Sequence, residues 1–286
     1  MSGEPRSEAR PMRSGSRAWR GVAIGAVLVI IVVALTPYIW MFLTSFKNRL
    51  EVQADKPVWT FSPTFEHYGG VFIDKKYLPL VWNSVFIATG TTILSLLIGV
   101  PAAYVFARSR FRGKEDLFFF FLTTRMAPAI SVVVPMYLLF NKLGLLDTRV
   151  VVVLAHSTFN LSLVVWMMRG FFADIPPQMD EAAQLDGHTR AGAFVRVILP
   201  LAAPGIAATA VLCFIMSWNE FLYAFILASF ESRTLTVGIP GLVTPHGTLW
   251  GQVAAVAVVA TLPIILFTIV VQRHLVRGLT FGAVKG

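Results

Sequence analysis

Charge and cysteine are both scarce in this chain of 286 residues. Only 14% of the residues are charged and 56% are hydrophobic, whereas about a quarter of the residues in a soluble domain are charged. The single cysteine, Cys213, excludes an internal disulfide. The mean hydropathy is +0.71, and the apolar residues form blocks instead of amphipathic stripes. These features exclude an ordinary soluble domain and indicate that lipid is the main solvent of the chain.

Common sequence motifs of enzymes are also absent. No G-x-x-x-x-G-K-[ST] occurs, because Lys114 after Gly113 is followed by Glu115, so the chain has no such loop to cradle ATP phosphates. HExxH, G-x-S-x-G and clustered Ser/His/Asp are absent as well. We therefore expect a protein that is not an enzyme and binds no cofactor of its own.

An ion-coupled secondary transporter stays as an alternative. Proteins of that class typically have internal repeats and several intramembrane carboxylates, and both features are missing from this sequence.

Six apolar runs are long enough to cross the hydrocarbon core of a membrane, which needs about 20 residues of helix. Each run is expected to be helical, because the backbone polar groups of a span must be satisfied within the segment. The predicted spans are residues 21–43, 82–107, 117–140, 150–168, 201–230 and 251–271. The sequence thus predicts an all-α, polytopic transmembrane helical bundle of six spans over residues 21–286.

The 24 basic residues are distributed unevenly between the loops. Fifteen lie in the N-terminal tail, the second and fourth loops and the C-terminal tail, eight lie in the other loops, and Arg125 lies within a span. The side that is richer in lysine and arginine faces the cytoplasm, so both termini are expected there. Residues 1–20 are expected to form a disordered cytoplasmic tail. The net charge of +9 then reflects membrane orientation and not nucleic-acid binding.

The fourth loop, residues 169–200, is the only long loop on the predicted cytoplasmic side. Asp174 can cap a helix whose first turn holds two prolines. Gly187 supplies a break at which a positive φ is allowed, and Thr189 can cap a second helix. The loop is therefore predicted to present a short helix, a glycine turn and a second helix to the cytoplasm.

This loop resembles the cytoplasmic signature loop of ABC importer permeases. The matching pattern is E-A-A-x-x-D-G-x(6)-F-x(4)-L-P, formed by Glu181, Ala182, Ala183, Asp186, Gly187, Phe194, Leu199 and Pro200. The C-terminal string QRHLVRGLTFGAVKG and the string WNEF in the fifth span resemble the second permease of maltose-type importers. The resemblance covers residues 21–286, and it identifies the chain as a binding-protein-dependent inner-membrane component of the carbohydrate subgroup.

The resemblance implies a type I ABC importer permease fold in the bacterial inner membrane, with membrane lipid around it. It implies a second, different permease subunit as partner, two ABC ATPase subunits that bind ATP and Mg²⁺, and an extracytoplasmic solute-binding protein. It further implies that the ATPase-coupling residues are Glu181, Ala182, Ala183, Asp186 and Gly187. The implied solute is a sugar or polyol, and glycerophosphate or an amino acid are the alternatives.

Two formal charges, Arg125 and Glu220, fall inside predicted spans. A charge at the centre of a bilayer is costly, so each is expected to face a cavity or a partner. Trp218 and Asn219 beside Glu220 offer stacking and hydrogen bonding that suit a sugar. The four residues are therefore predicted to line the pathway. The alternative is that the two charges pair with each other or with the partner permease and only hold packing.

His156 and Asn160 are four residues apart, so they share one face of the fourth span. A lone buried histidine is more often a hydrogen-bonded structural residue than a ligand. No second histidine, cysteine or acid in the sequence makes a metal-binding set with it. We interpret His156 as structural and predict no metal site.

Overall fold

The computed structural model describes residues 17–245 and 247–282, and these residues are mostly helical. The all-α class is confirmed, apart from an antiparallel hairpin of two residues per strand, β1 (Val243–Thr244) and β2 (Gly247–Thr248). Among the described residues, four continuous helices are long and apolar enough to cross a membrane. The number of candidate spans rises to six if each of two bent helix pairs is counted as one span. The continuous helices that contain a candidate span are α1 (Arg17–Ser45), α4 (Leu78–Arg108), α7 (Arg149–Asp174) and α14 (Trp250–Gly282). Residues 1–16 of the predicted tail lie outside the described residues.

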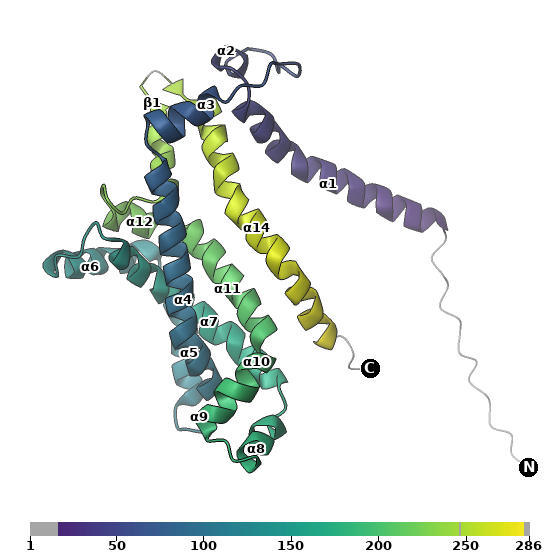
Figure 1. Cartoon of the computed structure of the whole chain (residues 1–286), viewed down its shortest axis with the longest axis vertical. Coiled ribbons are helices and arrows are strands. Elements are labelled where there is room, and N and C mark those ends of the chain that lie inside the picture. The colour runs from purple at the N-terminus through teal and green to yellow at the C-terminus, as the bar shows by residue number, and fades with distance from the viewer. Residues whose placement is uncertain (1–16, 246, 283–286) are drawn as a thin grey trace, which may run out of the picture.

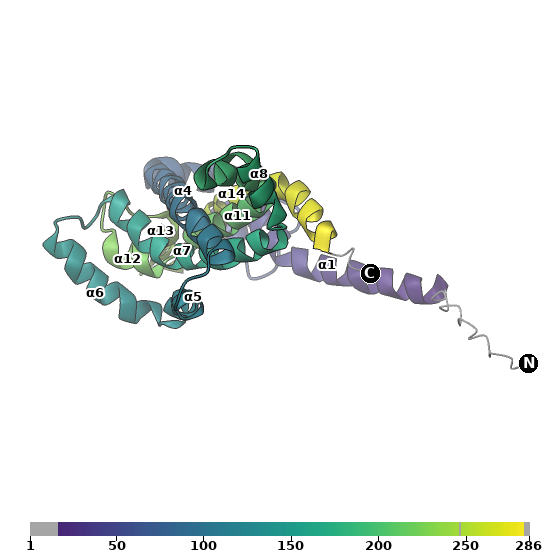
Figure 2. The same ribbon diagram turned by 90° about the horizontal axis from the view of Figure 1, so that it is seen from below.

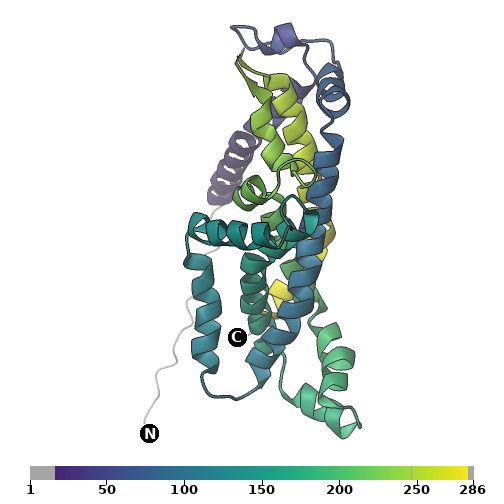
Figure 3. The same cartoon turned by 90° about the vertical axis from the view of Figure 1, so that its left-hand side faces the viewer.

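The predicted span 117–140 is not one helix. It is divided at Ala127, whose backbone is extended (φ −64°, ψ 132°) and precedes Pro128. The proline ring disfavours helical geometry at the residue before it, which explains the break at this position. The two parts, drawn in teal, meet at a bend of 94° (Figure 3). They are α5 (Lys114–Thr123) with the 3₁₀ turn η2 (Thr124–Met126), followed by α6 (Ala129–Lys142).

The predicted span 201–230 is also divided. The helix ends at Trp218, and the chain becomes helical again only at Leu222. A second bend, of 74°, lies at Ala202, just before Pro204 in the first turn of the following helix. The elements of this region are α9 (Arg190–Ala193), the π-helix η3 (Phe194–Ile198), α10 (Leu199–Leu201), α11 (Ala203–Trp218) and α12 (Leu222–Leu227).

The two ends of the molecule are built differently (Figure 1). One end carries the hairpin and several short helices, and the opposite end carries α8 (Gln178–Leu185) and α9. Helix α4 runs between these ends, and α14 starts beside the hairpin. The remaining short elements are α2 (Arg49–Val52), α3 (Glu66–Tyr68), the π-helix η1 (Gly69–Asp74), α13 (Leu235–Gly238) and the 3₁₀ turn η4 (Ile239–Leu242).

Helices α4 and α7 form the central pair of the bundle, and glycines let them approach closely. A Cβ added at Gly99 would lie 2.6 Å from a methyl group of Val164, and one at Gly90 would lie 3.2 Å from Val153. Small residues at such contacts allow van der Waals packing between helices, which matters in lipid because the hydrophobic effect does not drive helices together there. The glycines of α4 therefore set the spacing of the core.

Helix α1 stands apart from the rest of the bundle. Its most apolar window has no buried residue, and it projects away from the other helices (Figure 2). Only its C-terminal part packs near α14 in Figure 1. An apolar helix of this length must be covered by lipid or by another membrane protein.

A carboxylate holds together two loops near the start of α7. Asp147 accepts hydrogen bonds from the backbone N–H groups of Ser229, Phe230, Glu231 and Ser232 at 2.9–3.1 Å. Burial alone would raise the pKa of this carboxyl, but these four N–H groups together outweigh burial and lower the pKa to about 2. The charge on Asp147 thus stabilises the segment that follows α12.

We expect Asp147→Asn to lower the stability of the protein by about 1 kcal/mol at neutral pH, because the amide has one acceptor oxygen and no charge. The pKa of Asp147 is lowered from 3.8 to about 2, so its contribution is complete above about pH 4 and is lost as the pH falls towards 2. Thermal unfolding followed by tryptophan fluorescence should show a difference from the native protein that shrinks over this range. Asp74→Asn, at an exposed acid, is the control, and equal unfolding of Asp147→Asn and the native protein at pH 7 would contradict the prediction.

Candidate functional site

The loop between α7 and α11 forms the predicted pair of helices, with one correction at its start. Helix α7 continues through Asp174, and the N-cap position of α8 is occupied by Pro177, so the predicted capping role of Asp174 is wrong. The two predictions for the rest of the turn are confirmed. Gly187 has a φ of +89°, and the Thr189 hydroxyl caps α9 by accepting from the Gly192 N–H at 3.1 Å.

Helix α8 is tied to the end of α4 by a buried carboxylate. Asp180 is 8% exposed, and its Oδ2 lies 2.8 Å from Nε of Arg108. The Tyr104 hydroxyl donates to Asp180 Oδ1, and Nη2 of Arg108 donates to the Ile175 carbonyl at 2.7 Å. The last turn of α4 therefore holds both α8 and the segment that leads into it.

The predicted coupling residues divide into an inner and an outer group. Ala183 is buried against the bundle, whereas Glu181, Ala182, Asp186 and Gly187 are exposed. The outer face also presents Leu185, which is 88% exposed and one helical turn from Glu181. The outer face of α8 thus carries one large apolar side chain next to Glu181 and Ala182. Reasoning from the sequence missed both Leu185 and the anchor Asp180.

We expect Asp180→Ala to loosen α8 and to lower stability by about 2 kcal/mol, because it leaves the guanidinium of Arg108 without its carboxylate in a mostly buried position. Hydrogen exchange of the backbone amides of residues 178–185, measured by mass spectrometry in the assembled transporter, should become faster. Asp174→Ala, at an exposed acid in the last turn of α7, is the matched control. Unchanged exchange rates in Asp180→Ala would show that α8 is held by other contacts.

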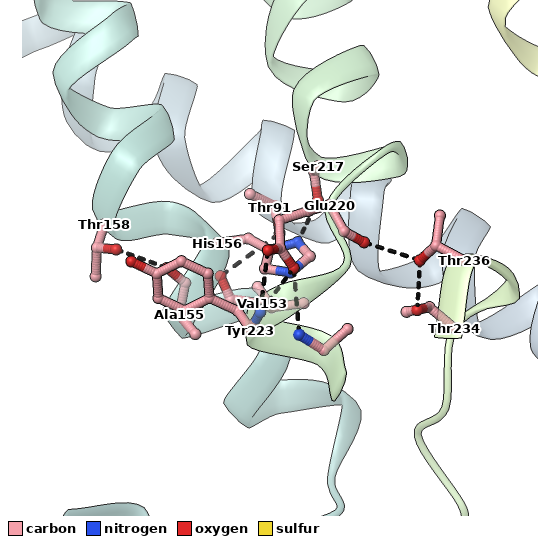
Figure 4. A network of polar contacts seen from close by, with 11 residues as sticks. Thr91, Val153, Ala155, His156, Thr158, Ser217, Glu220, Tyr223, Thr234 and Thr236 are labelled. Carbon is pink, nitrogen blue, oxygen red and sulfur yellow. Dashed lines mark hydrogen bonds and ion pairs between the residues drawn. The ribbon is translucent and has the colours of Figure 1, made fainter. Parts of the chain in front are cut away.

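A second polar site lies at the break between α11 and α12 (Figure 4). His156 of α7 is fully buried, with Nδ1 2.7 Å from the Ser217 hydroxyl and Nε2 3.0 Å from Oε2 of Glu220. The same carboxylate accepts from the backbone N–H groups of Tyr223 and Ala224 at 3.0–3.2 Å. A carboxylate can only accept, so Nε2 donates its proton to Glu220. Glu220 thus joins α7 to the positively polarised N-terminus of α12.

This network agrees with the structural interpretation of His156. His156 has two hydrogen-bond partners on α11 and the break that follows it. Among the described residues, no group of three or more histidine, cysteine, aspartate or glutamate side chains could hold a metal ion. Asn160, one turn along α7, is buried, and its amide has no partner in the described part of the chain.

The four predicted pathway residues do not share one surface. Trp218 is 3% exposed and donates from its indole to the Ala260 carbonyl at 3.0 Å. Asn219 is exposed, and so is Arg125, whose Nη2 lies 3.5 Å from the sulfur of Met216. Arg125 does not pair with Glu220, whose carboxylate is occupied by His156 and backbone N–H groups.

Comparison with known proteins places the chain in a family. Residues 95–281 match the family described as the binding-protein-dependent transport system inner membrane component. A trehalose transport system permease protein of Mycobacterium tuberculosis is 38% identical, over 91% of this chain and 97% of the relative. A trehalose/maltose transport system permease protein of Thermococcus litoralis is 34% identical, over 92% of this chain and 95% of the relative.

Solved structures agree with this placement. A bacterial ABC transporter involved in the import of the acidic polysaccharide alginate superposes with a TM-score of 0.75 at 28% identity, over 92% of this chain and 99% of the matched chain. A methionine ABC transporter in an inward-facing conformation has a TM-score of 0.58 at 18% identity, over 72% of this chain and 98% of its own, which shows a shared fold. The chain therefore belongs to the binding-protein-dependent inner-membrane components, the non-enzymatic, multi-pass permease subunits of ABC importers.

Proposed function

We propose that this permease forms half of the translocation pathway for a sugar or polyol and is driven through α8 by a separate ATPase. The single observation that carries the proposal is the geometry of α8. Its outer face presents Glu181, Ala182 and Leu185 to a partner, while Asp180 ties its inner face to α4. A helix that is exposed on one side and anchored on the other can pass a movement of the ATPase to the bundle.

The carbohydrate class is supported by the names of the relatives. They include permeases described as transporting trehalose and maltose, and a diacetylchitobiose permease of Streptomyces coelicolor that is 34% identical over 94% of this chain. Glycerophosphate and amino acids stay as the alternative solutes. We propose that Arg125 and Asn219 face the pathway, since both are exposed. Trp218 and Glu220 would then support the wall of the pathway without facing it, because both side chains form hydrogen bonds with neighbouring helices.

We further propose that both termini and α8 lie in the cytoplasm. Helix α1 ends at Ser45 and helix α14 begins at Trp250, and both of these helix ends lie at the hairpin end of the molecule (Figure 1). If each crosses the membrane once, their other ends lie on the side of α8. The hairpin end would then face the solute-binding protein, a partner that is present with one of the structural neighbours.

The proposed assembly contains a second, different permease and two ABC ATPase subunits that hold ATP and Mg²⁺. The exposed apolar surface of α1 supports a membrane partner. The test is purification of the assembly from its native membrane, identification of the retained subunits by mass spectrometry, and ATP hydrolysis measured with the binding protein and a panel of sugars. We expect stimulation by a sugar. Uptake that needs an ion gradient and no ATP would overturn the proposal in favour of a secondary transporter.

A further inference from the structure

A cavity of about 500 Å³ lies where α1 meets the start of α14, at the hairpin end of the molecule. Its walls come from the last turns of α1, from the segment that follows α1, and from the first turns of α14. Trp40 of α1 and Trp250 of α14 both line it. Tryptophans at the ends of spans mark the level of the lipid headgroups, so the cavity lies at the surface of the membrane.

A buried cation faces this cavity. Lys47 is 2% exposed, and among the described residues it forms no ion pair. Its Nζ lies 4.0 Å from the ring centre of Trp40 and 5.4 Å from that of Phe61. Cation–π contacts offset only part of the cost of taking an ammonium group out of water. An anion inside the cavity would supply the missing partner.

A second polar group in the same wall also lacks a partner. The hydroxyl oxygen of Thr44, three residues before Lys47, is buried and has no hydrogen bond within the described chain. Glu51, the nearest acid in sequence that lines the cavity, is occupied by the capping of α2, where it exchanges two 2.9 Å hydrogen bonds with Asn48. The buried ammonium and hydroxyl groups together make a site for an oxyanion.

The rest of the lining points to an oxyanion with an apolar tail. The cavity is also walled by Met41 from α1 and by Val253, Ala254 and Ala257 from α14. These side chains continue into the apolar surface of α1, which the described residues leave uncovered. Free phosphate would gain no binding free energy from these apolar walls. The acyl chain of a lipid would cover them and remove their apolar surface from water.

We propose that the cavity binds one membrane phospholipid, with its phosphate against Lys47 and Thr44 and its acyl chains between α1 and α14. Asp55 and Lys56 at the rim of the cavity provide both signs of charge, which suits a zwitterionic headgroup such as phosphatidylethanolamine. The bound lipid would fill the angle between α1 and the bundle and so fix the position of α1.

The test uses the assembled transporter, washed in mild detergent and titrated with a photoreactive phosphatidylethanolamine. Lys47→Met should weaken lipid binding about tenfold, a loss of about 1.4 kcal/mol, while Lys47→Arg should retain it. Lys142→Met, at an exposed lysine on α6, is the matched control. Inorganic phosphate at the same concentration should not compete.

Three results would overturn the proposal. One is equal labelling of Lys47→Met and the native transporter, which would place the lipid elsewhere. Another is a crosslink from a photoreactive residue placed at Thr44 to the partner permease instead of to lipid, which would show that a protein side chain fills the cavity. Displacement of the lipid probe by inorganic phosphate would also overturn it, because the site would then select the anion and not the lipid. Thr44→Val, which removes the hydroxyl and keeps the shape, should cause a smaller loss than Lys47→Met.

Discussion

Replacement of Gly187 by proline should abolish the stimulation of ATP hydrolysis by the solute and its binding protein, with membrane insertion intact. Gly187 has a φ of +89° and donates its N–H to the Gln184 carbonyl at 3.1 Å. Proline fixes φ near −65° and has no N–H, at a cost of about 3 kcal/mol or more. The turn between α8 and α9 would then change direction, and the outer face of α8 would no longer meet the ATPase. We expect stimulated hydrolysis to fall at least about tenfold, which corresponds to 1.36 kcal/mol in activation free energy.

A glycine of the same conformation elsewhere in the chain provides the control. Gly144, in the turn between α6 and α7, has a φ of +65°, and a Cβ at either glycine would meet no atom within 4 Å. Gly144→Ala and Gly187→Ala therefore introduce similar strain without a clash, and only Gly187→Ala should reduce the stimulation. Glu181→Lys reverses a charge on the outer face of α8. Glu181 is exposed, so its replacement should not unfold the protein. Normal stimulation in Gly187→Pro and Glu181→Lys would remove α8 from the coupling path.

Replacement of Glu220 by alanine should lower the stability of the protein by about 3 kcal/mol. The change leaves the buried Nε2 of His156 and the backbone N–H groups of Tyr223 and Ala224 without their acceptor. Glu220→Gln keeps one acceptor oxygen and should cost less. The measurement is thermal unfolding of the assembled transporter, together with uptake of solute, because the break between α11 and α12 is expected to lose its fixed angle.

The neighbouring Asn219 is the matched control for Glu220. Asn219 is exposed, and its side-chain amide donates to the Ile215 carbonyl of the preceding helix at 2.9 Å. Asn219→Ala should change stability by no more than about 0.5 kcal/mol, although it is expected to reduce uptake if Asn219 faces the pathway. A double-mutant cycle between Glu220→Ala and His156→Leu should give a coupling energy within about 0.5–3 kcal/mol. Additive effects in that cycle would mean that the two side chains do not stabilise each other.

The features that the sequence predicted well are local. The apolar runs 21–43, 82–107, 150–168 and 251–271 each lie within one helix, because a membrane span satisfies its own backbone and is visible as composition alone. The positive φ of Gly187 and the cap at Thr189 were also predictable, since both depend on neighbouring residues in the chain. The break at Ala127 has a local signal in the following Pro128. The break at Asn219 was less visible, because an apolar run without a proline does not reveal a change of direction.

The sequence by itself determined that this chain is a multi-pass membrane protein with a helix–glycine–helix loop between two spans, because hydrophobicity and turn chemistry act over a few residues. Only the tertiary structure decided which polar groups meet. Asp180 binds Arg108 across 72 positions, and His156 meets Glu220 across 64 positions. Lys47 lines one cavity together with residues of α1 and α14, which are far apart in the sequence. Such pairings depend on the packing of distant helices, and nothing in the local sequence of either partner specifies them.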